Sequence, residues 1–556
     1  MSQKVTVTNV NVEELSRNVQ PLITRRDRMK VSKSMMMNHK KRGFTRLSER
    51  LVLVLAAAII LAGCSSADEA ASNEITIVLP EEPRTLASWN AYSNDGHPVL
   101  RNIGEALVNR DPVSNELVGE LATEWKQVDP KNWQFTLREG VTFTDGTPFN
   151  AEAAAAGLNY VLSEANAFPM RNFLGSQTTA SAVSEYLLNV ATVDPDPILD
   201  LRLYFVTIPQ AAAIAVDPAS YETNPIGTGP YKLTSWTRGE SIVLEQNTDW
   251  WGISSPGDAK GAQTITKATY VFRTEQTVRS SMVQAGEADF SRWISPEDCE
   301  SGVPVCSGGA TVETGILRLD NMHPAMKDLR VRTAMALAFD KQEVMDLIGG
   351  GKPVPQIVGP SALGFNDALA PFGKDVEKAK ALIAEAKAAG VNVSAPITVA
   401  ARTGFVPNGQ EALTYIADAF NAIGLTAKTT LLETAAAEKQ WTMGYKNIPK
   451  DRGWAGFWFH GNELMDYSAS VGSYYACNGP VSAYCNPKVD AMYKEALQAT
   501  GQDRDTKLAA IAAFVYDDAA VIPVGQPLFY FGMSAKINWT PRMDGFILLK
   551  EISFNS

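Results

Sequence analysis

Histidine is scarce in this chain, and the motifs in which it usually does chemistry are missing. Only 4 of the 556 residues are histidine, and three of these, His97, His323 and His460, follow the N-terminal region. None lies in the H-E-x-x-H pattern of zinc proteases, and no G-x-S-x-G nucleophile elbow is present. The glycines of Gly349 to Lys352 lack the spacing of a phosphate-binding loop. The chain therefore lacks these local signatures of an enzyme, although carboxylates that meet only in space would leave no such pattern.

Long apolar runs are also lacking, with one exception near the N-terminus. The uncharged run Leu51 to Gly63 follows the basic segment Lys40 to Arg50. It is shorter than the roughly 20 residues that a membrane-spanning helix needs, and it fits the hydrophobic part of a secretory signal. The run ends in the letters LAGC, which resemble a bacterial lipobox, the signal in which the peptidase cuts before a diacylated cysteine.

The lipobox predicts that residues 1–63 are a lipoprotein signal peptide and that Cys64 is the acylated residue. The basic part is long for such a signal, and Met35 to Met37 offer a more compact start. The alternative is a free cysteine beside a chance apolar run. We expect the mature chain to lie outside the cytoplasm, anchored to the bacterial cell membrane through Cys64.

Positive charge is in short supply once the predicted signal is set aside. Residues 1–63 hold 12 of the 50 Lys and Arg but only 4 of the 61 Asp and Glu, which leaves 38 basic and 57 acidic residues, a net charge of −19. Such a surface repels phosphate backbones and excludes nucleic acid as a favoured partner. It suits cationic or zwitterionic ligands, or it is simply a solvated acidic surface.

Cysteine is rare as well, with 5 in the chain. Besides Cys64 there are two close pairs, Cys299 with Cys306 and Cys477 with Cys485. Outside the cytoplasm, such short loops are typical of disulfides. Zinc would require closer spacing and accompanying histidines. We therefore expect two disulfides, no metal and no cofactor.

Strand and helix patterns alternate along the chain, which predicts an α/β fold. Period-two alternation predicts strands at 75–80, 241–246, 265–272 and 397–401, and a hairpin over 133–146. Helical periodicity is clearest at 151–165, 330–348, 376–389, 411–423, 489–499 and 505–520.

A series of short motifs then occurs in a recognisable order. They are WQFTLREGVTFTDGTPF (133–149), NPIGTGPYKL (224–233), LEQNTDWWG (244–252), AGEADF (285–290), LRVRTAMALAFDKQEVM (329–345), YCNPKVDAMYKEA (484–496) and AAVIPV (519–524). Together they resemble the extracytoplasmic solute-binding proteins of ABC importers, in the oligopeptide/dipeptide/nickel-binding family. Each motif alone is weak, but their joint order covers nearly the whole mature chain.

The resemblance implies a type II periplasmic-binding-protein-like fold of two lobes with the ligand cleft between them. Lobe I is expected at 64–105, 226–312 and 524–556, an extra N-terminal subdomain at 106–225, and lobe II at 313–523. The segments 315–321 and 523–531 would cross between the lobes as hinges. Closure of such hinges is a population shift driven by ligand contacts.

The resemblance also implies the function. It predicts a monomeric, lipid-anchored receptor that captures peptides and delivers them to the membrane permease of an ABC importer, whose ATPase is a separate protein. The first alternative is the same role for a non-peptide solute such as a metal chelate or a haem-like molecule. The second is a surface receptor or chaperone-like protein that binds another protein.

The aromatic segment Gly453 to Tyr467 corresponds to one wall of the family's cleft. Trp454 and Trp458 would supply flat apolar walls with a polar edge, and the alternative is that they are part of the core. Peptide-binding members usually carry an acidic residue for the peptide's α-ammonium just after a W-x-G or W-x-A element, but Phe457 stands there. Glu463 or Asp466 could supply the carboxylate from a shifted position, because a buried ammonium is costly unless it is paired.

Four further side chains are candidate ligand contacts. Trp293 follows the AGEADF motif, and Asn321 lies on the first predicted crossover. Arg402 follows a predicted strand and could bind a ligand carboxylate through two hydrogen bonds, or be an exposed structural arginine. His460 is a candidate for contact with a metal chelate, although a lone histidine cannot hold a metal by itself.

Overall fold

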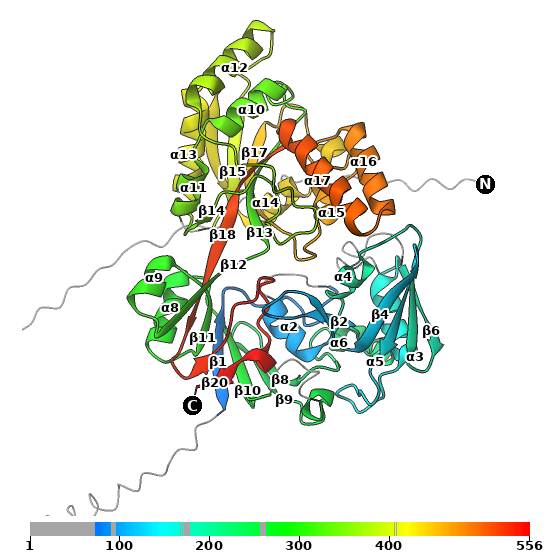
Figure 1. The fold of residues 1–556 in the computed structure, drawn as a ribbon. Helices are drawn as coiled ribbons and strands as arrows, with labels where there is room; N and C mark the ends of the chain where they lie inside the picture. Colours follow the sequence, from blue (N-terminus) through cyan, green and yellow to red (C-terminus); the bar gives the residue numbers. More distant parts are fainter. Residues whose placement is uncertain are drawn as a thin grey trace, which may run out of the picture. The chain divides into compact units, whose positions relative to one another are not determined.

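The computed structural model describes residues 73–90, 96–166, 168, 171, 178–255, 263–404, 406 and 408–555 (Figure 1). The predicted signal peptide at 1–63 and the predicted acylation site Cys64 lie outside these ranges. Within them, none of the helices is both long and apolar enough to span a membrane.

The sheet of lobe I is centred on β1, which pairs in parallel with β10 on one side and β11 on the other. Alternate residues Ile75, Ile77 and Leu79 are buried, as the period-two pattern predicts. Its elements are β1 (Glu74–Leu79), α2 (His97–Ile103), β8 (Tyr231–Thr237), β9 (Ser241–Gln246), η2 (Trp251–Ile253), β10 (Lys267–Phe272), α8 (Gln276–Gln284), β11 (Phe290–Ile294), α9 (Pro296–Ser301), β12 (Val305–Ala310), β19 (Ile537–Asn538), η5 (Leu549–Glu551) and β20 (Ser553–Phe554).

The extra subdomain is built on a four-stranded antiparallel sheet in the order β4-β5-β7-β6. Its elements are β2 (Val108–Arg110), β3 (Leu117–Gly119), β4 (Ala122–Asp129), β5 (Asn132–Leu137), α3 (Ala151–Leu162), β6 (Thr178–Ser184), β7 (Leu187–Thr192), α4 (Leu199–Leu203), α5 (Ala211–Val216) and α6 (Pro218–Tyr221). Its core also includes Trp89, Trp250 and Trp251, which lie outside the predicted range 106–225. The predicted boundaries remain a prediction.

The hairpin predicted over 133–146 is wrong. Its first half is β5, but β5 pairs with β4 on one edge and with β7 on the other. Both edges are therefore occupied, and residues 141–146 contribute only an isolated bridge between Thr142 and Pro148. The real hairpin is β4–β5, one strand earlier.

Lobe II has helices on both faces of its sheet (Figure 1). Its elements are β13 (Glu313–Leu319), α10 (Leu329–Leu337), α11 (Lys341–Leu347), β14 (Gly351–Lys352), α12 (Val376–Ala388), β15 (Ile397–Arg402), α13 (Gly409–Ala422), β16 (Ala427–Leu432), α14 (Thr434–Trp441), η3 (Tyr445–Asn447), β17 (Trp454–Gly461), α15 (Tyr467–Ser470), the π-helix η4 (Val471–Tyr475), α16 (Pro487–Gln498) and α17 (Gly501–Asp517). One apolar core packs under α10 to α13, and another under α14 to α17.

The single helix predicted over 330–348 is wrong, because two helices, α10 and α11, occupy this range. Asp340 has extended backbone angles and its side chain accepts a hydrogen bond from the amide of Gln342, which caps the start of α11. The ammonium of Lys341 donates to the carbonyls of Ala336 and Phe339 at the end of α10. These bonds satisfy the end of α10 and the start of α11 separately, so they favour two helices over one continuous helix.

The long strand β18 (Val521–Met533) belongs to both lobes. Its first half pairs with β13, and its second half pairs with β11 and β12. The two segments predicted as crossovers thus fall on β13 and β18, which are adjacent strands of one sheet.

Candidate functional site

Strand β17 divides the aromatic segment between two faces of the lobe II sheet. Successive side chains of a strand point to opposite faces. Ala455, Phe457 and Phe459 face the core beneath α10 to α13, and Phe457 has no exposed surface. Trp454 and Trp458 belong to the opposite face, as does His460. Phe457 therefore packs in the core on the sheet face opposite to that of Trp454, Trp458 and His460.

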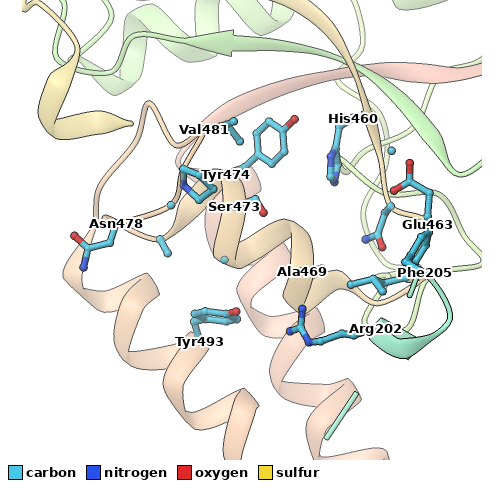
Figure 2. Close-up of a pocket in the computed structure, with 17 residues that line it drawn as sticks. Arg202, Phe205, His460, Glu463, Ala469, Ser473, Tyr474, Asn478, Val481 and Tyr493 are labelled. Atoms are coloured by element: carbon cyan, nitrogen blue, oxygen red, sulfur yellow. The ribbon is translucent and has the colours of Figure 1, made fainter. Parts of the chain in front are cut away.

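A cavity of about 470 Å³ lies on this second face (Figure 2). It brings together two of the predicted site residues, His460 and Glu463. Its wall contains Arg202, Phe205, His460, Gly461, Asn462, Glu463, Leu464, Ala469, Gly472, Ser473, Tyr474, Ala476, Asn478, Gly479, Pro480, Val481 and Tyr493. Figure 2 shows Glu463 and Asn478 on opposite sides of it.

His460 is a neutral part of this wall. Its Nε2 lies 2.6 Å from Ser470 Oγ, and its ring lies 4.5 Å from that of Tyr474. Asn462 Nδ2 also donates to Ser470 Oγ, at 2.8 Å. Burial lowers the pKa of His460 to about 3, so the ring stays uncharged near neutral pH. Within the described ranges, His460 belongs to no group of three or more His, Cys, Asp or Glu that could hold a metal.

The two candidate carboxylates have different surroundings. Asp466 is fully buried, and its carboxylate accepts hydrogen bonds from Arg504 and from the amide and hydroxyl of Ser468. It caps the start of α15 and is engaged within the fold. Glu463 is only partly buried and lines the cavity. Of the two, Glu463 is the one placed to meet a ligand.

Glu463 also reaches a second, much smaller cavity, whose wall includes Trp293, Phe529 and Asp544. The Trp293 ring stacks on Phe529 at 4.9 Å, and the guanidinium of Arg292 lies 4.1 Å from the Trp293 ring. Trp293 has φ 55°, a left-handed conformation that is rare for a bulky side chain, and it lies where the pairing of β11 with β18 shifts register. The structure thus brings the predicted residues Trp293 and Glu463 to one cavity.

A series of ring contacts, the first edge-on and the second stacked, leads from the main cavity wall to Trp458. Tyr474, in the cavity wall, lies 6.2 Å from Trp441, and Trp441 stacks on Trp458 at 4.9 Å. The guanidinium of Arg402 lies 5.8 Å from the Trp458 ring, within the range of a cation–π contact. Trp458 and Arg402 are partly exposed, whereas Trp454 is only 7% exposed and packs in the apolar core.

Asn321 is not among the residues that line either cavity. Its Nδ2 donates to the carbonyl of Leu319 at 2.9 Å and to that of Ala520 at 3.0 Å. These bonds tie the end of β13 to the start of β18, so the side chain holds the two crossing strands together.

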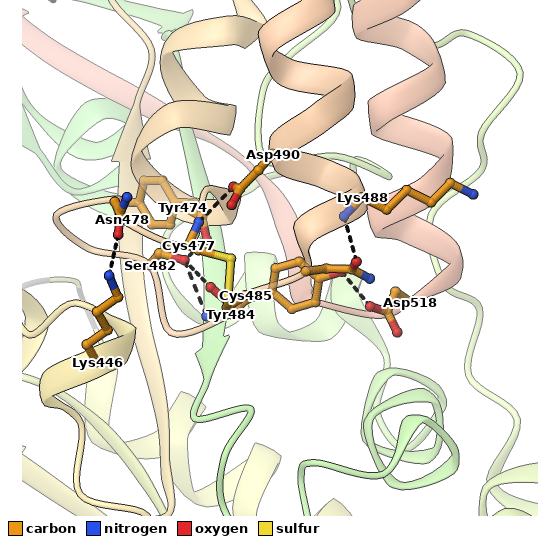
Figure 3. Close-up of a disulfide and its surroundings, with 11 residues drawn as sticks. Lys446, Tyr474, Cys477, Asn478, Ser482, Tyr484, Cys485, Lys488, Asp490 and Asp518 are labelled. Atoms are coloured by element: carbon orange, nitrogen blue, oxygen red, sulfur yellow. Dashed lines mark hydrogen bonds between the residues drawn. A yellow bond between two sulfur atoms is a disulfide. The ribbon is translucent and has the colours of Figure 1, made fainter.

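Both predicted cysteine pairs are joined as disulfides, Cys299 with Cys306 and Cys477 with Cys485. The second, between Cys477 and Cys485, closes a short loop (Figure 3). Residues 478–481 of this loop line the main cavity. Ser482 reinforces the loop, because its hydroxyl donates to the carbonyls of Tyr474 and Tyr484.

The sequence reasoning missed the wall formed by Arg202 and Phe205 and the wall formed by residues 472–481 and Tyr493. The first comes from the extra subdomain, far from β17 in sequence, and carries no local signal. The second could have been suspected, since glycines and tyrosines cluster there around a cysteine pair.

Comparison with known proteins places this architecture in a family. A family model described as bacterial extracellular solute-binding proteins, family 5 Middle, matches residues 116–475. Protein XP55 of Streptomyces lividans is 28% identical over 294 residues, which are 51% of this chain and 52% of that protein. Di/tripeptide-binding protein 2 of Pseudomonas aeruginosa is 25% identical over 366 residues, 60% of this chain and 65% of that protein. The chain thus spans less than two thirds of the length of these curated relatives.

The fold has close counterparts among solved structures. The crystal structure of the ABC transporter substrate-binding protein CtaP from Listeria monocytogenes matches with a TM-score of 0.75 at 20% identity, over 87% of this chain and 99% of that one. This likeness confirms the predicted two-lobed α/β fold. The family match covers more than half of the chain and confirms a binding protein rather than an enzyme. The chain belongs to the bacterial extracellular solute-binding proteins, family 5.

Proposed function

We propose that the chain captures short peptides in the cavity beside Glu463 and delivers them to an ABC importer. The observation that carries the proposal is a carboxylate in the wall of a cavity of about 470 Å³ that is otherwise lined largely by neutral groups. A peptide's α-ammonium is costly to bury unless it meets such a carboxylate. The cavity volume falls within the roughly 300–1,000 Å³ of typical ligand sites.

Other side chains complete the proposed site. The cavity wall includes Arg202, whose Nε lies 2.8 Å from Asp196 Oδ2. We assign His460 and Trp293 to contacts beside Glu463, and Trp458 with Arg402 to an outer contact reached along the series of ring contacts. Phe457, Trp454, Asn321 and Asp466 would support these groups from within the fold.

The transport role rests on the family and on relatives. One relative is named Di/tripeptide-binding protein 2, which fits a peptide ligand. The loaded protein, as a monomer, would dock on the membrane subunits of an importer, where a separate protein hydrolyses ATP. Cys64 would carry the lipid anchor that keeps the receptor at the membrane.

A second candidate is a non-peptide solute such as a metal chelate or a haem-like molecule. It is favoured by the position of Phe457, which is fully buried where peptide-binding relatives are expected to present a carboxylate. The neutral His460 in the cavity wall would suit contact with such a solute.

Native mass spectrometry of residues 65–556, purified gently and then denatured, tests the proposal. A ladder of short peptides released from the protein is the expected result. Glu463→Gln is expected to weaken binding of those peptides, resynthesised, by at least about tenfold, since a hydrogen bond to a charged group is worth about 1.5–3 kcal/mol. Glu377→Gln, at an exposed position of α12, is the control and should bind normally. A single non-peptide mass would overturn the peptide proposal and favour the second candidate.

A further inference from the structure

The extra subdomain makes a specific connection to the ligand-facing segment of lobe II. The connection consists of an apolar side chain, Leu464, and a cation, Arg110. Leu464 directly follows Glu463 in the chain, and Arg110 bonds to the main-chain carbonyls of both residues. Glu463 is the central ligand contact in the proposed function, on which this inference rests.

Leu464 is built into the core of the subdomain. It is 6% exposed and packs in the cluster formed by Phe205, Tyr204 and other buried residues of that subdomain. Among the buried residues of that core within the described ranges, Leu464 alone comes from 313–523, and Ala469 packs against the same core from the surface. The segment that carries Glu463 is therefore anchored outside its own lobe.

The side chain of Arg110 forms hydrogen bonds to main-chain carbonyls of the same segment. This guanidinium is buried on β2, and its Nη2 donates to the carbonyl of Leu464 at 3.0 Å and to that of Glu463 at 3.4 Å. Its Nη1 donates to the carbonyl of Asn115 at 2.7 Å, and its guanidinium carbon lies 5.4 Å from the centre of the Tyr204 ring. A planar guanidinium with several fixed donors can hold two carbonyls in a set orientation, which an ammonium cannot do equally well.

The contacts of Arg110 and Leu464 hold the main chain at this point, and the Glu463 side chain lines the cavity. Glu463 lies beside Phe205 in Figure 2, and the subdomain residues Arg202 and Phe205 form the wall next to it. We infer that the extra subdomain positions Glu463 for the ligand, with Leu464 as its anchor and Arg110 as its clamp. Opening of the cavity on this side requires Leu464 to leave the subdomain core.

Hydrogen–deuterium exchange on the ligand-free mature chain tests the connection without relying on any peptide. In Leu464→Ala, amides of 461–469 and of α4 are expected to exchange together, at least about tenfold faster than in the wild type, because local opening of both sides is linked. Leu464→Met should restore the protection. Leu413→Ala, which truncates a fully buried leucine in the lobe II core under α10 to α13, is the matched control and should leave α4 unchanged.

Two results would overturn the inference: unchanged exchange of α4 in Leu464→Ala, or the same coupled change in Leu413→Ala. Should Leu464→Ala fail to fold, Arg110→Lys keeps the charge but loses the two-carbonyl grip, and it must speed exchange at 461–469. A second readout uses the peptides released from the wild type, which are expected to dissociate about tenfold faster from Arg110→Lys than from the wild type. If the wild type retains no peptide, the proposed function fails, while the exchange data still decide the connection.

Discussion

Both terminal nitrogens of Arg504 donate to the carboxylate of Asp466, with Nη1 2.5 Å from Oδ2 and Nη2 2.7 Å from Oδ1. Both side chains are almost completely buried. This geometry gives Asp466 a role in stability, and the proposed contact with the ligand's ammonium therefore falls to Glu463, three residues earlier.

Asp466→Asn is expected to lower the free energy of unfolding by about 3–5 kcal/mol, because it leaves the buried cation of Arg504 without its counter-charge. Urea unfolding followed by circular dichroism measures the change. Asp503→Asn, which removes the exposed partner of Lys507 on the same helix as Arg504, should unfold close to the wild type. Equal stability of Asp466→Asn and Asp503→Asn would contradict the assignment.

The two tryptophans of β17 should also differ in role, with Trp454 acting on stability and Trp458 on ligand binding. Trp454→Ala is expected to cost about 3–5 kcal/mol of unfolding free energy, since it empties a buried site in the core under α14 to α17. Trp458→Ala removes a partly exposed ring from the stack with Trp441 and Arg402. We expect it to weaken the affinity for the released peptides by more than about 1 kcal/mol, with a smaller loss of stability. Calorimetry and urea titration of both variants check this, and normal binding by Trp458→Ala would exclude it from the site.

Much of the local structure was predictable because its causes are local. Strand β9 lies at the predicted residues 241–246, and α12 ends one residue before the predicted 389. Alternation along β9 and the 3.6-residue period of α12 each follow from one buried face. The cysteine pairs were predictable for a similar reason, since each closes a loop of only a few residues.

The break between α10 and α11 had a local cause in the capping residue Asp340, but the failed hairpin and the missed cavity wall depended on partners distant in sequence. The 133–146 hairpin did not form because the second edge of β5 pairs with β7, which lies some 50 residues later in the sequence. The cavity is a stronger case, because Arg202 and Phe205 of the subdomain line it together with His460, more than 250 residues away in sequence. A pattern within a short window carries no information on such contacts.

Lipid anchoring through Cys64 has a direct test in a bacterial host. Cys64→Ala is expected to leave peptide binding intact and to release the protein from the membrane, because the variant lacks the thiol that would be acylated. Fractionation of membranes and medium, followed by immunoblotting, measures this. Persistent membrane attachment of the variant would falsify the lipobox interpretation.

The disulfide between Cys477 and Cys485 should matter for binding as well as for stability. It closes the loop whose residues 478–481 line the cavity, and Asp490 Oδ1 also accepts a hydrogen bond from the Cys477 amide at 3.0 Å. Replacing both cysteines with alanine is expected to cost about 2–4 kcal/mol of stability. It should also weaken peptide affinity, as measured by calorimetry.

The other disulfide supplies the matched control. Cys299 and Cys306 lie in lobe I, at α9 and β12, away from the wall of the main cavity. Their double alanine variant should lose stability but bind peptides normally. Equal loss of affinity in the two double variants would mean that the loop 478–481 has no special part in binding.

Glu105 should make stability depend on pH in a direction opposite to that of the buried histidines. Its carboxylate is buried and accepts hydrogen bonds from the indole nitrogens of Trp250, at 3.0 Å, and Trp251, at 3.0 and 3.1 Å. Burial raises its pKa to about 7, and the nearby charge of Glu120 adds to this, while Lys550 and the two indoles oppose it. The folded state therefore keeps a proton that the unfolded state releases above about pH 4.5.

The folded protein should lose stability from Glu105 as pH rises from about 4.5 to 7, and Glu105→Gln should avoid that loss. The difference in unfolding free energy between the variant and the wild type is expected to grow by up to about 3 kcal/mol across this window, since each pKa unit is worth about 1.4 kcal/mol. Burial also lowers the pKa values of His97 and His460 to about 3, which costs stability as pH falls below about 6.5. Both histidines are present in the two proteins, so their effect cancels in the difference. Urea unfolding at several pH values measures it, and parallel curves for the two proteins would show that Glu105 is ionised in the folded state throughout.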